Sequence, residues 1–113
     1  MYEAGSERGV YEFDWVSYTK AIRTSIRFLD NVLTFSDYPL EKNKKMAMDY
    51  RRIGLGYTAL ADTLALLGYA YDSEEGMRFA EQLASTLRDE SYLASALLAK
   101  EKGMFPALKR NGG

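Results

Sequence analysis

Apolar residues recur at helical spacing in two long stretches of the chain. The first stretch starts near Phe13, where Asp14 can cap a helix and Phe13 can pack on Tyr18 in the next turn. Its apolar positions recur three to five residues apart and predict one inner helix face, made of Val16, Ala21, Ile22, Ile26, Leu29, Val32 and Leu33. Pro39 closes this stretch, because the residue before a proline is pushed towards an extended conformation.

Two shorter helices are expected in the middle of the chain. One covers about 39–49, because Pro39 suits the first position of a helix. The other follows Thr58, which can act as its N-terminal cap, and ends at Gly68, since glycine is favoured after the last helical turn.

The longest helix is expected in the last third of the chain. Asp72 and Glu75 form a capping-box pattern, and the apolar stripe runs from there to about Lys102. Its inner face is expected to hold Met77, Ala80, Leu83, Ala84, Leu87, Ala94, Leu97 and Leu98. Gly103 then stops the helix and Pro106 prevents it from resuming.

The segment 53–57 is ambiguous. Its Gly54 and Gly56 each disfavour a helix by roughly 1 kcal/mol relative to alanine. A strand is the alternative, but a lone strand leaves its main-chain donors and acceptors unpaired, and no other segment is a convincing strand. The segment therefore pairs across a dimer, forms a loop or is absorbed into a helix. We expect a mainly α-helical fold of four helices with at most one short strand.

Length and composition predict one modest core. The chain has 113 residues, 47% of them hydrophobic, and a net charge of −1, so no overall field attracts nucleic acid or an anionic membrane. No stretch approaches the roughly 20 apolar residues of a membrane-spanning helix, and no signal peptide is visible, so we expect a soluble, cytoplasmic protein. The expected divisions are a flexible arm over 1–12, a single helical domain over 13–106 and a disordered tail over 107–113.

The residue types restrict the chemistry further. The chain has no cysteine and no histidine, which excludes disulfides, thiolate nucleophiles, imidazole bases and ordinary zinc sites. Asp62 lies in an apolar helix, and we expect it to be partly buried against a main-chain group or an arginine such as Arg51 or Arg52. The basic group of Lys42, Lys44, Lys45, Arg51 and Arg52 is best explained as a solvated helix face, so nucleic-acid binding is not expected.

The run from Gly54 to Ala59 also spells G-x-G-x-x-A, the pattern of a dinucleotide-binding turn. That turn needs a buried apolar strand before it and an acidic residue on a second strand about 20 residues later. Here residues 48–52 are too polar for such a strand, and Asp72 is better explained as a helix cap. Close packing is therefore the favoured interpretation of the glycines.

The stretch RRIGLGYTALADTLALLG, residues 51–68, resembles the strand-to-helix passage in the catalytic barrel of ribonucleotide reductase large subunits, where GxGxxGLAD is common. The likeness extends over 13–106, and RFLDNV at 27–32 is most similar to the adenosylcobalamin-dependent class. Ala59 departs from the usual glycine. In that family the catalytic cysteine loop precedes this region and a phosphate-binding turn follows it.

The resemblance implies structural roles alone for this chain. They transfer to Gly54, Gly56, Leu60, Ala61 and Asp62, and no catalytic, cofactor-binding or metal-binding residue is carried over. The implied function is a segment of a ribonucleotide reductase barrel that is inactive alone and is completed by other reductase polypeptide, with adenosylcobalamin possible in the complete enzyme. The alternative is a freestanding helical module that self-associates without catalysis. In either case exposed apolar faces need cover, and we expect a homodimer.

Overall fold

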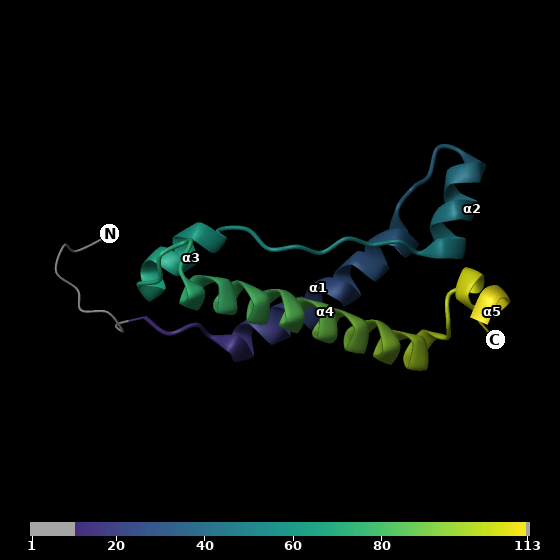
Figure 1. Cartoon of the computed structure of the whole chain (residues 1–113). Helices are drawn as coiled ribbons and strands as arrows, with labels where there is room; N and C mark the ends of the chain where they lie inside the picture. The colour runs from purple at the N-terminus through teal and green to yellow at the C-terminus, as the bar shows by residue number, and fades with distance from the viewer. Residues whose placement is uncertain (1–10, 113) are drawn as a thin grey trace.

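The computed structural model describes residues 11–112, and within that range it contains five helices and no strand. The helices are α1 (Trp15–Phe35), α2 (Glu41–Tyr50), α3 (Leu60–Leu67), α4 (Glu74–Lys102) and α5 (Pro106–Gly112) (Figure 1). The mainly helical class is confirmed, with five helices in place of the expected four. The predicted arm lies almost entirely outside the described residues.

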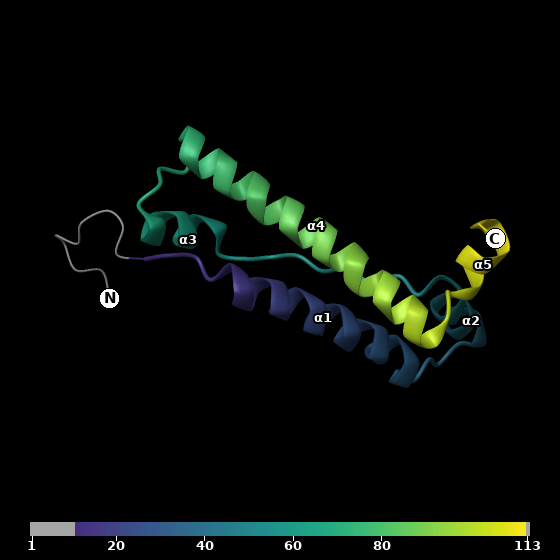
Figure 2. The ribbon, with the colours of Figure 1, turned by 90° about the horizontal axis from the view of Figure 1, so that it is seen from below.

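The long helices α1 and α4 lie side by side and run in the same direction (Figures 1 and 2). Near their beginnings, the Tyr18 hydroxyl donates to the Leu83 carbonyl at 3.1 Å. Near their ends, Lys102 Nζ lies 3.0 Å from Asp30 Oδ2. Because both helices are long and parallel, they form one flat layer rather than a closed bundle.

The extended segment 51–59 crosses this layer in the opposite direction. Figure 1 shows it above the two helices and Figure 2 shows it between them, so it lies along their shared groove on one face. There Leu55 packs on a cluster formed by Ile22, Ile26 and Ala94. This contact attaches the middle of the segment to both helices.

A second cluster closes the other end of the layer. It consists of Leu64, Phe79 and Leu83, against which the partly buried Phe13, Trp15, Tyr18, Leu60 and Leu67 pack. The Phe13 and Tyr18 rings lie 5.4 Å apart in an edge-on arrangement, which confirms the contact expected at the start of α1.

Three helix boundaries follow the sequence prediction. Asp14 caps α1, where its Oδ1 accepts from the Ser17 N–H at 2.9 Å. Gly68 and Gly103 end α3 and α4 with φ angles of 77° and 88°, which glycine adopts without the steric strain of a side chain.

Three other boundaries were predicted wrongly. The cap of α4 is Ser73, not Asp72, because the Ser73 hydroxyl accepts from the Gly76 N–H at 3.1 Å. The cap of α3 is Ala59, not Thr58, in a left-handed conformation without a side-chain bond. The helix expected from Pro39 begins at Glu41, after an extended Leu40.

The end of the chain also differs from expectation. Pro106 begins α5 instead of preventing a helix, since the first helical position needs no N–H donor. The tail expected to be disordered is therefore helical through Gly112. It packs against α2, where Arg110 Nη2 lies 3.3 Å from Asp49 Oδ2.

Little of the apolar surface is buried inside this chain. Among the described residues, seven hydrophobic side chains are buried: Ile22, Ile26, Leu64, Phe79, Leu83, Ala94 and Ala107. Four residues expected on inner faces, Val16, Val32, Met77 and Leu97, are exposed instead, and Val16 is 81% exposed. The apolar stripes are thus wider than the cover that this chain provides. No helix of the described part is long and apolar enough to cross a membrane.

Candidate functional site

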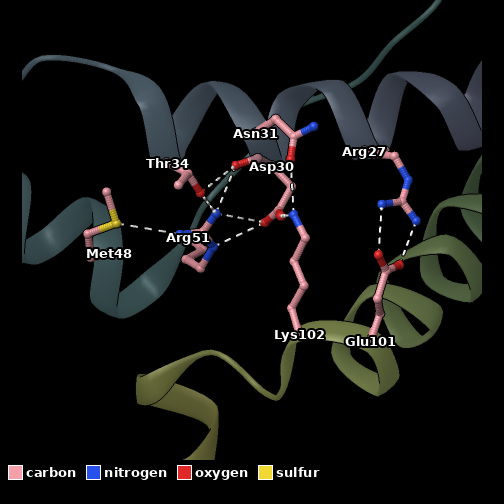
Figure 3. Close-up of polar contacts among 8 residues, drawn as sticks. All are labelled: Arg27, Asp30, Asn31, Thr34, Met48, Arg51, Glu101 and Lys102. Atoms are coloured by element: carbon pink, nitrogen blue, oxygen red, sulfur yellow. Dashed lines mark hydrogen bonds and ion pairs between the residues drawn. The ribbon is translucent and has the colours of Figure 1, made fainter.

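A polar cluster joins α1, α4 and the beginning of the extended segment (Figure 3). Its centre is Asp30, whose Oδ1 accepts from Arg51 Nε at 3.0 Å and from Arg51 Nη2 at 2.9 Å. The Lys102 ammonium donates to Asp30 Oδ2 and to Asn31 Oδ1, both at 3.0 Å. One carboxylate thus holds two cations that are 51 residues apart in sequence.

Arg51 has an unusual backbone for its residue type. It ends α2 with φ 46° and ψ 47°, a left-handed conformation that is unfavourable by roughly 1–2 kcal/mol for a residue with a Cβ. Its guanidinium also donates to the Asp30 carbonyl and to Thr34 Oγ1, both at 2.8 Å. These charge-assisted bonds offset the strain, so the side chain fixes the direction in which the chain leaves α2.

The charge of Asp30 is stabilised by its partners. Burial alone would raise the pKa of this carboxyl, but the hydrogen bonds from Lys102 and Arg51 outweigh that effect and lower the pKa below its ordinary value. The Asp30 and Arg51 side chains are only 17% and 19% exposed, so water screens this pair weakly. The neighbouring Arg27–Glu101 pair in Figure 3 is about half exposed at both ends.

Beyond Arg51 the main chain has no partner. Within residues 11–112, no hydrogen bond to another protein group is formed by the N–H and C=O groups of 52–58. This stretch lies between two non-glycine residues with positive φ, Arg51 and Ala59. An extended run of this length with open donors and acceptors has the form of a strand without neighbours.

The two faces of the extended segment differ. Leu55 packs on the helices, and Ile53 lines the hollows beside α4. Since side chains alternate along an extended chain, Gly54 and Gly56 point away from the helices. A Cβ added at either glycine would meet no atom within 4 Å, and neither has a positive φ. Within this chain, the expected close packing at these glycines is therefore not formed.

Two connected hollows border the segment on the side of α4. One has a volume of about 600 Å³ and reaches from Ile26 to the loop after α4. The other, of about 400 Å³, continues towards Leu87. Both are lined by Ile26, Ile53, Tyr92 and Ser95, so together they form a single groove along α4.

The remaining sequence-predicted site residues lie at the start of α3. Leu60 packs on the cluster around Leu64, while Ala61 and Asp62 are exposed. The expected pairing of Asp62 with Arg51 is wrong, because Arg51 binds Asp30. Arg52 instead stands over the Tyr50 ring, 5.1 Å from its centroid.

Sequence reasoning missed the cluster around Asp30, although one signal was present. Asp30 stands next to Leu29 in a stretch whose other inner positions are apolar. A carboxylate at the edge of an apolar stripe needs a cationic partner, but periodicity along one helix does not identify a partner on another element.

The geometry defines a class of protein. Two parallel helices on one face of an extended segment that runs opposite to them form one section of an α/β layer, in which helices cover a parallel sheet. Comparison with known families agrees: residues 6–111 match the family of the ribonucleotide reductase barrel domain. The chain belongs to this ribonucleotide reductase family.

Individual relatives are much longer than this chain. A vitamin B12-dependent ribonucleoside-diphosphate reductase of Mycobacterium tuberculosis (strain CDC 1551 / Oshkosh) is 42% identical over 94 residues, which are 83% of this chain and 14% of that protein. The protein of the same name from Thermoplasma acidophilum is 38% identical over 96 residues, 85% of this chain and 12% of that protein. The ribonucleoside-diphosphate reductase subunit alpha of Chlamydia pneumoniae is 35% identical over 86 residues, covering 76% of this chain and 8% of that protein.

Proposed function

We propose that this chain is a structural section of a ribonucleotide reductase barrel and that the reduction of ribonucleotides is performed by polypeptide outside it. The observation that carries this proposal is the extended run 52–58, which has no main-chain partner within the described residues. Burying such groups unpaired is unfavourable by about 1–3 kcal/mol each. The segment therefore gains stability only when neighbouring strands complete a sheet.

The residues of this chain act on position rather than on substrate. Asp30 and Arg51 set the start of the strand, Leu55 attaches its middle to the helices, and Leu60 anchors α3 behind it. The chain has no cysteine to supply thiol chemistry. Consequently its contribution to catalysis is a rigid wall of the barrel.

The names of the relatives suggest a cobalamin cofactor for the complete enzyme. Adenosylcobalamin would supply radical chemistry there. Among the described residues, no group of three or more Asp and Glu side chains is arranged to hold a metal ion, and the chain has no histidine. The residues present therefore do not fit a cobalamin site, and we assign no contact with the cofactor to this chain.

A segment exchange tests the proposal. The 94 matched residues of the Mycobacterium tuberculosis relative are replaced by the corresponding residues of this chain, and formation of deoxyribonucleoside diphosphate is measured with adenosylcobalamin and a dithiol reductant. We expect the exchanged enzyme to retain activity, since the helices and the strand are equivalent.

Two controls make this result decisive. A version with a glycine-serine linker in place of the 94 residues is expected to lose activity, and the isolated chain is expected to have none. A folded, inactive exchanged enzyme would contradict the proposal, as would turnover by the isolated chain.

Self-association is a second proposal, favoured by the exposed apolar side chains. Phe35 is 82% exposed and Tyr92 is 74% exposed, and such surfaces favour contact between copies. We expect the isolated chain to sediment as a homodimer at micromolar concentration. A stable monomer at that concentration would refute this proposal without affecting the first one.

A further inference from the structure

The edge of the run 52–58 that faces α4 borders the groove described above. We infer that this edge accepts one strand, parallel to 52–58, from the polypeptide that completes the barrel, and that alternate apolar side chains of this strand fill the groove along α4. The inference rests on the proposed function. It identifies the edge, the direction and the chemistry of the partner.

The open main-chain groups determine that the partner is a strand. Each residue of 52–58 offers an N–H and a C=O without a partner in the described part of the chain. A helix has satisfied its own main-chain groups and cannot bond to such an edge, whereas an extended chain can pair along its whole length.

The position of the groove selects the edge beside α4. Both of its hollows are lined by Ile53, so a strand bound at this edge passes directly over them. A separate hollow beside α1 is lined only by residues of that helix, such as Val16 and Lys20, and does not reach the segment. Side chains of an added strand therefore find room next to α4.

The direction follows from α4. In an α/β layer, each helix runs opposite to the strands that it covers, and the run 52–58 already runs opposite to α4. The second strand covered by α4 has the same direction. Consistent with this, α4 ends beside the beginning of the run, where Lys102 and Arg51 both bind Asp30.

The lining determines which side chains fit. The groove is bounded by Leu87, Leu98 and Tyr92, with the small residues Ser95 and Ala96 between them. The charged groups at its end, Asp30, Arg51 and Lys102, are already paired with one another. Medium-sized apolar side chains at alternate positions of the incoming strand match this surface, because charged ones would lose hydration without gaining a partner.

Hydrogen exchange tests the inference in the exchanged Mycobacterium tuberculosis enzyme. Rates are read at single residues by electron-transfer fragmentation, and they are compared with rates in the isolated chain. We expect the amides of 52–58 to exchange at least about 100-fold more slowly in the exchanged enzyme, because sheet pairing protects them.

A blocking substitution tests the edge itself. Ser95→Tyr fills the groove, while Lys100→Tyr is a control at an exposed position of α4 that does not line it. In an extended chain, successive N–H groups point to opposite edges. Ser95→Tyr is therefore expected to remove the protection of every second amide in 52–58, and Lys100→Tyr to leave all of it.

The outcomes separate this inference from the proposed function. Fast exchange throughout 52–58 in the exchanged enzyme, active or inactive, would overturn the inference. So would full protection in the Ser95→Tyr enzyme. Protection without turnover would support the inference while contradicting the catalytic proposal. Urea unfolding of the isolated variants serves as a folding control, with both midpoints expected close to that of the unsubstituted chain, since residues 95 and 100 are exposed.

Discussion

Arg51 and Asp30 are joined by two bonds to one carboxylate oxygen, at 2.9 and 3.0 Å, and by a third to the Asp30 carbonyl at 2.8 Å. This contact connects the left-handed end of α2 to the middle of the layer formed by α1 and α4. Because the strand-like run begins at the next residue, the pair determines where that run starts.

The neighbouring arginines Arg51 and Arg52 provide a matched test of this contact. Arg51→Ala removes charge-assisted bonds at a site with little screening, and we expect it to lower the free energy of unfolding by about 1.5–3 kcal/mol. Arg52→Ala removes an exposed side chain, with an expected change within about 0.5 kcal/mol. Urea unfolding measures both, and equal effects would contradict the role of Arg51.

Asp30 should make stability depend on pH. A carboxyl whose pKa is lowered by folding stabilises the fold above its unfolded pKa, near 3.9, and this contribution is lost as the pH falls through the folded pKa. The stability difference between the unsubstituted chain and Asp30→Asn should therefore be constant from pH 7 to about pH 5 and shrink in stronger acid.

Thermal unfolding between pH 7 and pH 2 measures this difference. The pKa values of Asp14, Asp89 and Glu101 are also lowered, chiefly by hydrogen bonds from Ser17, Arg88 and Arg27 respectively. These exposed groups are present in both proteins, so the comparison isolates Asp30. A difference that stays constant down to pH 2 would show that the charge of Asp30 contributes nothing.

Ala59 and Ala61 provide a second matched pair. Ala59 has φ 61°, so glycine removes a left-handed strain, and Ala59→Gly should stabilise the chain by up to about 1 kcal/mol. Ala61 lies inside α3, where glycine should destabilise by about 0.5–1 kcal/mol. Opposite signs in chemical denaturation are expected, and the same sign for both would mean that Ala59 is not strained.

Glycine positions separate internal from external packing. A Cβ at Gly76 would lie 2.6 Å from the Ala70 carbonyl oxygen, so Gly76→Ala should destabilise the isolated chain by about 1–3 kcal/mol. At Gly54 there is room, and Gly54→Ala should leave the isolated chain unchanged or stabilise it by up to about 1 kcal/mol. Destabilisation by Gly54→Ala in the same unfolding assay would show that the chain itself packs against this glycine.

Local signals predicted the long helices well. Asp14, Gly68 and Gly103 determine boundaries through contacts or conformations within a few residues of the chain, and such signals are visible in the sequence. The cap of α4 was misplaced by one residue because Asp72 and Ser73 can both cap a helix, and only the fold decides which one does.

The orientation of the helix faces and the polar cluster could not be predicted in the same way. Val16 and Leu97 belong to apolar stripes but remain exposed, because the polypeptide that would cover them is not part of this chain. The pairing of Asp30 with Arg51 and Lys102 joins three separate elements. Periodicity describes one element at a time, so it gave no indication that these residues meet.

The most direct test of the account is amide hydrogen exchange in the isolated chain. We expect the amides of 52–58 to exchange at nearly the rate of an unstructured peptide, while those around Ile22, Ile26 and Leu83 in the two long helices are strongly protected. Protection of 52–58 equal to that of the long helices would contradict the account, because the run would then already have its partners.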